Sequence, residues 1–88
     1  APAASPDGRF VAFISDRDGP SDLFLLDRST GAVTRLTTGL RAQGQPGWAP
    51  DGRRLVFNAA PGEVSEVFVV RADGAGLTRL TTGAEGTR

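Results

Sequence analysis

Carboxylates are the only common catalytic side chains available to this chain. Its 88 residues include no His, Cys, Lys or Tyr. A Ser-His or Cys-His dyad and a Schiff-base lysine are therefore excluded, and so are the usual zinc sites, which need His or Cys. The one acidic cluster consists of Asp16, Asp18 and Asp22.

The spacing of this cluster is loosely similar to that of a calcium loop, in which several oxygens converge around one turn. However, the distal Glu of such loops is missing. The second half of the chain also has different residues at the equivalent positions, namely Ala60, Gly62 and Glu66. We interpret the cluster as the solvated part of a hairpin loop, and we expect no catalytic residue, no metal and no cofactor.

The chain repeats itself with a period of 44 residues. Residues 1–44 and 45–88 align without a gap and are identical at 14 of 44 positions. The PDGR motif of residues 6–9 returns at 50–53, and the run TRLTTG returns whole. A period in this range is typical of solenoids, propellers and arrays. We therefore divide the chain into two units, 1–44 and 45–88.

Each unit consists of four short segments separated by turn residues. Apolar runs of about four to six residues between Gly and Pro are typical of strands buried on both faces. None of the segments reaches the roughly 10–12 residues of an ordinary helix. The sequence predicts an all-β fold of two four-stranded antiparallel propeller blades. The expected strands are 2–5, 10–14, 23–26 and 33–38, then 45–49, 53–59, 66–71 and 77–82.

Charge and hydropathy argue against two classes of partner. Ten acidic residues balance ten arginines, so the chain lacks the electrostatic footprint of a nucleic-acid or anionic-membrane binder. No apolar run approaches the roughly 18 residues that a membrane-spanning helix needs. We expect neither nucleic acid nor a membrane as a partner. The sequence itself does not indicate the compartment.

Several motifs resemble the TolB-like β-propeller repeats, relatives of the WD-type repeats. They are SPDGRFVAF at 5–13, WAPDGRRLVF at 48–57, DLFLLD at 22–27 and RLT at 35–37. The resemblance covers almost the whole chain and departs from the family pattern at Ala4, where the second copy has Trp48. It implies a six-bladed ring. Members of this family occur as the TolB propeller, which binds partners in the bacterial periplasm, and as gating propellers of prolyl-oligopeptidase-type enzymes.

Two blades leave two apolar faces open, and large exposed apolar patches mark partner surfaces. Three chains would close a six-bladed ring through head-to-tail contacts. Four chains with eight blades are the nearest alternative, and a monomer is the least favoured state. If the chain is instead a piece of a longer array, the missing blades belong to the same polypeptide.

We therefore expect a non-enzymatic, self-assembling propeller module that acts as a structural or protein-interaction scaffold. One alternative is an excised fragment of the gating propeller of a prolyl-oligopeptidase-type serine peptidase. Another is a ring that binds a small ligand or glycan. The family resemblance suggests the bacterial periplasm or another extracytoplasmic location.

Two sets of residues follow from this interpretation. A protein or peptide partner is expected at the loop face, with the candidates Asp16, Arg17, Asp18, Arg41, Gln43 and Gln45. Blade packing is expected from Trp48, Phe13, Phe57, Phe24 and Phe68. Trp48 has the alternative role of a ligand-stacking platform, but we favour packing with its indole N–H satisfied. Arg35 and Arg79 are expected to protect an exposed edge strand or to bond an adjacent blade.

Overall fold

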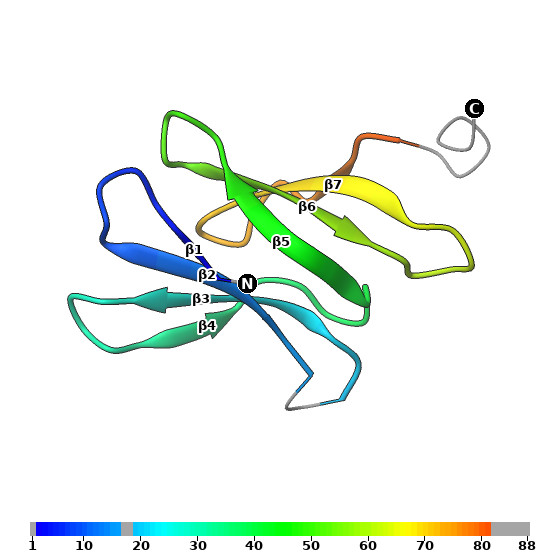
Figure 1. Cartoon of the computed structure of the whole chain (residues 1–88), viewed down its shortest axis with the longest axis horizontal. Helices are drawn as coiled ribbons and strands as arrows, with labels where there is room; N and C mark the ends of the chain where they lie inside the picture. Colours follow the sequence, from blue (N-terminus) through cyan, green and yellow to red (C-terminus); the bar gives the residue numbers. More distant parts are fainter. Residues whose placement is uncertain (1, 17–18, 82–88) are drawn as a thin grey trace.

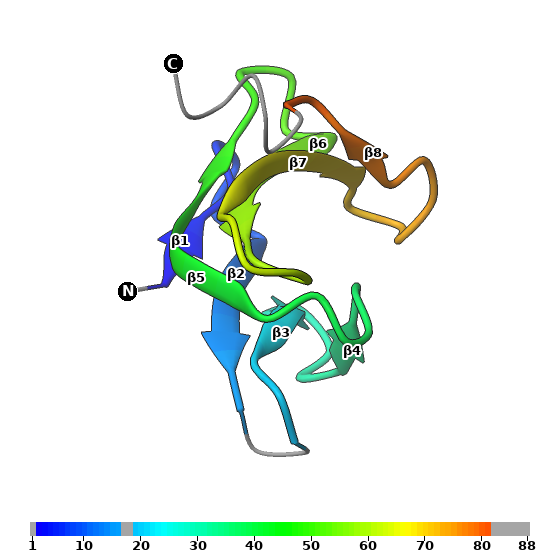
Figure 2. The ribbon, with the colours of Figure 1, turned by 90° about the vertical axis from the view of Figure 1, so that its right-hand side faces the viewer.

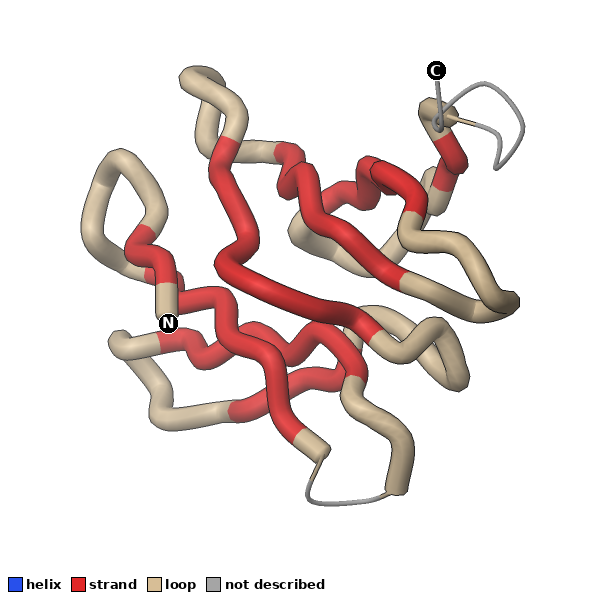
Figure 3. Tube along the Cα trace, turned by 45° about the vertical axis from the view of Figure 1, so that its right-hand side comes forward, coloured by secondary structure: helices blue, strands red, loops and turns tan. Residues whose placement is uncertain are grey.

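The computed structural model describes residues 2–16 and 19–81 and contains two four-stranded antiparallel sheets within that range (Figure 1). The first sheet has the order β1 (Ala3–Ala4), β2 (Phe10–Ser15), β3 (Asp22–Asp27) and β4 (Val33–Arg35). The second has the order β5 (Ala42–Trp48), β6 (Arg54–Ala59), β7 (Glu66–Arg71) and β8 (Thr78–Arg79). Strands and loops make up all of this part of the chain, and it holds no helix capable of crossing a membrane (Figure 3). The all-β prediction is confirmed.

The repeated PDG motif forms the tight turn between the first two strands of each sheet. In the first sheet the Gly8 amide donates to the Ser5 carbonyl at 2.8 Å. Asp7 Oδ1 accepts the Arg9 amide at 3.0 Å. Gly8 has φ of +76°, a conformation that glycine adopts without strain. Asp51 accepts the Arg53 amide in the same way at 2.9 Å, so the Asp of the motif has a structural role in both turns.

The strand β5 begins three residues earlier than the predicted start at residue 45. It is anchored at Ala42, whose amide donates to the Ser21 carbonyl at 2.9 Å. The Ser21 hydroxyl donates back to the Ala42 carbonyl at 2.8 Å. The pairing of β5 with β6 is then interrupted between Gln43 and Gly47. Pro46 lies within this irregularity and has no amide to donate to a ladder.

The two sheets pack face to face and diverge toward their last strands. The strand β5 contacts β1, β2 and β3 of the first sheet. In Figure 2, β1 and β5 lie close together, whereas β4 and β8 lie farther apart. The first strand of each sheet is therefore the inner one, as the propeller interpretation requires.

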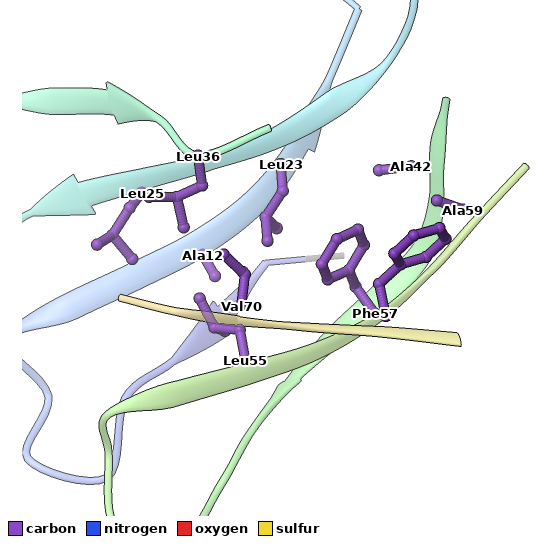
Figure 4. Packing of buried hydrophobic residues seen from close by; sticks show 10 residues of the cluster. Ala12, Leu23, Leu25, Leu36, Ala42, Leu55, Phe57, Ala59 and Val70 are labelled. Carbon is purple, nitrogen blue, oxygen red and sulfur yellow. The ribbon is translucent and has the colours of Figure 1, made fainter. Parts of the chain in front are cut away.

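The hydrophobic core lies between the two sheets (Figure 4). Successive side chains of a strand point to opposite faces, so alternate residues of the central strands meet there. The first sheet contributes Ala12, Leu23, Leu25 and Leu36, and the second contributes Ala42, Leu55, Phe57, Ala59, Phe68 and Val70. The structure thus has one shared core, and neither sheet has a core of its own.

Candidate interaction surfaces

The predicted loop face is assembled where the β2–β3 loop meets the connection into β5. The two hydrogen bonds between Ser21 and Ala42 join these segments. Arg41 lies exposed in the connection, and Gln43 and Gln45 lie exposed within β5. Asp16 lies exposed at the end of β2. Arg17 and Asp18 lie outside the described residues. Within residues 2–16 and 19–81, no group of three or more metal-ligating side chains is found here or elsewhere.

Asp22 does not belong to a solvated loop, so our interpretation of this residue was wrong. Its side chain is fully buried. Oδ2 accepts from Arg35 Nη2 at 2.7 Å and from the Gly39 amide at 2.9 Å. Oδ1 accepts from Thr37 Oγ1 at 2.8 Å and from the Leu40 amide at 3.1 Å. Asp22 therefore clamps β3 to the segment that follows β4.

This clamp should make stability depend on pH in the acid range. Burial alone raises the pKa of Asp22, but the bonds from Arg35, Thr37 and the two amides outweigh it and hold the pKa below its usual value of 3.8. The folded state thus favours the charged carboxylate. We expect a stabilisation that is present above the unfolded pKa and is lost as pH falls through the lower folded pKa.

Urea unfolding between pH 7 and pH 2 measures this effect. Asp7, Asp27 and Asp51 also have lowered pKa values, so the share of Asp22 is the difference between the unmodified chain and Asp22→Asn. That difference should shrink as the pH falls below 3.8. A difference that stays constant with pH would contradict the assignment.

The second sheet has a weaker version of the same clamp. Arg79 Nη1 lies 3.4 Å from Glu66 Oε2, and Thr81 Oγ1 accepts the Val67 amide at 3.0 Å. Each arginine binds an acid of its own sheet, so the expected bond to an adjacent blade was wrong, while edge protection by these residues of β4 and β8 stays a prediction. Glu66 Oε1 is buried and has no hydrogen-bond partner in the described part of the chain.

Trp48 joins the two sheets. Its indole N–H donates to the Ala3 carbonyl at 2.9 Å. Its ring stacks on Phe10, with centroids 6.4 Å apart and an interplanar angle of 28°. Both partners belong to the first sheet. The ring and the indole N–H of Trp48 thus both contact the other sheet, as a packing role requires.

The other aromatic residues form one directly opposed pair in each sheet. Phe57 and Phe68 lie across β6 and β7 with ring centroids 5.7 Å apart, and this pair faces the first sheet. Phe13 and Phe24 form the equivalent pair at 5.7 Å. Because their neighbours Ala12, Leu23 and Leu25 fill the shared core, strand alternation places this second pair on the opposite face.

We call the face of each sheet that carries its Phe pair the front and the other face the back. The front of the second sheet packs on the back of the first. The front of the first sheet and the back of the second remain uncovered by the described residues. The chain thus contains one front-to-back contact between sheets. One front and one back remain uncovered.

Comparison with known proteins identifies this arrangement. The family model "TolB beta propeller domain" matches residues 1–87. The chain belongs to the TolB β-propeller family. A solved structure described as a TolB from Agrobacterium tumefaciens is 36% identical with a TM-score of 0.83, covering 92% of this chain and 29% of that one. TolB from Acinetobacter baumannii is 27% identical with a TM-score of 0.78, covering 93% and 21%. The chain therefore spans less than a third of either structure.

The two sheets are TolB-type blades, and equivalent positions on their backs differ in exposure. Ala12 is 0% exposed and its equivalent Val56 is 39% exposed. Leu36 is 8% exposed and its equivalent Leu80 is 56% exposed. The backbone placement is nevertheless the same, because the amides of Leu36 and Leu80 each donate to the third strand of their own blade at 2.8 Å. The difference in exposure arises because the second blade covers the back of the first, whereas no described residue covers the back of the second.

The front of the first blade is partly covered from within. Phe24 is 4% exposed, since Phe13 stacks beside it and the Arg35 guanidinium lies 5.8 Å from its ring centroid. Val33, farther out on the same blade, is 47% exposed. The front therefore has a packed aromatic pair at its centre and an exposed valine toward the outer strand.

Proposed function

We propose that the chain is a non-enzymatic, self-assembling TolB-type propeller module that works as a structural or protein-interaction scaffold. The observation that carries the proposal is the exposure of Val56 and Leu80 on the second back, where the first blade buries Ala12 and Leu36. A blade front is the surface that covers such a back within this chain. Each chain offers one more front, so copies fit together head to tail.

Head-to-tail contacts of this kind close into a ring when the rotation per subunit allows it. Three chains would supply the six blades implied by the family resemblance, with a mass of about 27 kDa, three times 9.1 kDa. Four chains with eight blades are the nearest alternative. Both assemblies bury the two faces left open in one chain.

The junction between copies differs from the junction within a chain at several positions, and the most prominent is the position of Trp48. Inside the chain, Trp48 of one blade stacks on Phe10 of the other. Between copies, the equivalent positions are held by Ala4 and Arg54. A small side chain thus faces a long one, and the apolar stem of an arginine can cover the space that the indole leaves.

Light scattering tests the assembly. We expect about 27 kDa for the unmodified chain and 9.1 kDa for Val56→Glu, because the substitution places a charge within an apolar contact. Val64→Glu is the matched control. Val64 is 38% exposed against 39% for Val56, but it lies in the β6–β7 loop, outside both faces. A folded 9.1 kDa particle for the unmodified chain would contradict self-assembly.

A second candidate is a two-blade part of a larger TolB-type propeller, in which further blades of the same polypeptide cover both faces. It is favoured by the coverage of only 29% and 21% of the two solved TolB structures. It predicts a 9.1 kDa particle whose mass is the same in Val56→Glu and Val64→Glu. The same experiment therefore separates the two candidates.

The loop face is the proposed site for a protein or peptide partner. Its described candidates Asp16, Arg41, Gln43 and Gln45 are all exposed, and in a closed ring they would recur in every chain. The proposal of an extracytoplasmic location depends on the family alone. A pull-down measures how much protein or peptide partner each variant retains, and it tests the face with Arg41→Ala and Gln43→Ala. The control is Arg28→Ala, in the turn after β3 at the opposite end of the first blade.

A further inference from the structure

A cavity of about 590 Å³ lies at the turn end of the second blade. It is lined by residues 51–54 of the β5–β6 turn and residues 71–73 at the end of β7. Its volume falls within the roughly 300–1,000 Å³ of typical small-molecule sites. It is formed entirely by one blade, and Arg54 and Arg71 lie on the back face that another copy would cover in the proposed assembly.

The lining of this cavity carries more positive charge than the fold neutralises. Arg54 Nη2 binds Asp51 Oδ2 at 3.2 Å. Asp73 accepts the Ala75 amide through Oδ1 at 2.9 Å and keeps its negative charge, so the lining has three guanidinium groups against the two carboxylates of Asp51 and Asp73. The guanidinium groups of Arg53 and Arg71 have no ion pair or hydrogen bond in the described part of the chain. The charge of Arg53 also acts on Asp51, but the hydrogen-bond donors of Arg53 and Arg71 are available to an anion, and the lining has a net charge of +1.

Arg54 and Arg71 lie directly opposite each other on neighbouring strands. Like charges in this position destabilise a sheet. The first blade avoids the conflict, because it has Phe10 opposite Asp27. There Arg9 binds Asp27 through two nitrogens, at 3.0 and 3.3 Å. A blade can therefore fold without two arginines directly opposite each other.

The comparison of the two blades isolates the change. Arg53 is the equivalent of Arg9, and Arg71 takes the place of Asp27. Where the first blade supplies its own carboxylate, the second supplies another guanidinium. An anion from outside the chain would occupy the same position relative to Arg53 that the Asp27 carboxylate occupies relative to Arg9.

We propose that this cavity binds a small organic anion that carries a phosphate group or two carboxylates. Arg53 and Arg71 donate to its oxygens, and Arg54 adds charge at the side. Guanidinium groups form paired, charge-assisted hydrogen bonds with such oxyanions. The bound anion also removes the repulsion between Arg54 and Arg71.

Titration of the unmodified chain with inorganic phosphate and with succinate tests this proposal, using sodium chloride at matched ionic strength as the reference. Amide shifts in NMR spectra should concentrate in residues 51–54 and 71–73, and the melting temperature should rise with either anion beyond the chloride value. Binding of phosphate alone assigns a phosphoryl ligand, and binding of both assigns a general oxyanion site.

Arg71→Asp is the decisive variant. It restores the charge pattern of the first blade, so the fold is retained, and it should weaken binding by about tenfold or more, since a charge-assisted hydrogen bond is lost and a like charge gained. Arg28→Ala removes an exposed arginine of the first blade and should bind as before. Shifts no larger than with chloride, or unchanged binding by Arg71→Asp, would overturn the proposal. Light scattering in parallel measures the mass with and without anion, so that an effect of assembly on binding is detected separately.

Discussion

Asp22→Ala is expected to lower the free energy of unfolding by about 3 kcal/mol, the lower end of the range for removing one partner of a buried ion pair. The carboxylate is fully buried and accepts from Arg35, Thr37 and the amides of Gly39 and Leu40. Its removal leaves these donors without an acceptor. Arg35 is 31% exposed and regains some hydration, which keeps the loss from being larger. Urea unfolding followed by circular dichroism measures it.

Glu66→Ala is the matched control in the second blade. The contact of Glu66 with Arg79 is longer, at 3.4 Å, and Arg79 is 52% exposed, so the expected loss is about 1 kcal/mol, as for exposed pairs. Both variants are compared at one protein concentration, because assembly would make stability depend on it. Equal losses in the two blades would show that Asp22 has no special role.

The blade fold could be predicted because local turn chemistry and the repeat point to the same strands. The PDG turn is set by residues adjacent in sequence, and its bonds are the ones expected. The Phe pairs follow from the same spacing in both copies. A blade-to-blade contact follows in turn, since central strands with apolar residues on both faces need two neighbours.

The exposure of the side chains of β6 could not be predicted from the sequence alone. Leu55, Phe57 and Ala59 are buried, whereas Arg54, Val56 and Asn58 between them are exposed. The sequence indicates which residues are suited to burial on each face. It does not say whether a partner covers the face in a given chain, and for the second back no described residue does.

The Asp22 clamp was missed because its members lie far apart in the sequence. Asp22 and Arg35 meet only when β3 and β4 pair with Phe24 opposite Arg35. An Asp next to a polar loop is usually exposed, and that expectation was wrong here. The repeat held a usable signal, since an acid, an Arg and a Thr recur at the same offsets as Glu66, Arg79 and Thr81.

The early start of β5 was also outside the reach of pattern analysis. Arg41 adopts φ of +56°, and it is the one non-glycine residue in the described range with positive φ. The residues that follow include Gly44 and Pro46, which normally interrupt strands. The bonds between Ser21 and Ala42 hold the segment in place, and these depend on the packing of one blade against the next.

Trp48→Ala is expected to lower the free energy of unfolding by about 2–3 kcal/mol, somewhat less than for a fully buried Trp, because Trp48 is only half-buried. Its partners Phe10 and Ala3 belong to the other blade, so its loss weakens the joint between blades. The unfolding transition should therefore also broaden. Circular dichroism is the appropriate probe, since Trp48 is the only tryptophan.

Trp48→Phe separates the two contributions of this side chain. Phenylalanine keeps a ring against Phe10 but cannot donate to the Ala3 carbonyl, so we expect a loss of about 1 kcal/mol. A double-mutant cycle combines Trp48→Ala with Phe10→Ala. The coupling energy between the two side chains should be about 0.5–1.5 kcal/mol, as for stacked aromatic pairs. A coupling near zero would mean that the indole N–H, and not the ring, joins the blades. The ring would then also be dispensable at the proposed junction between copies, where Ala4 holds the equivalent position.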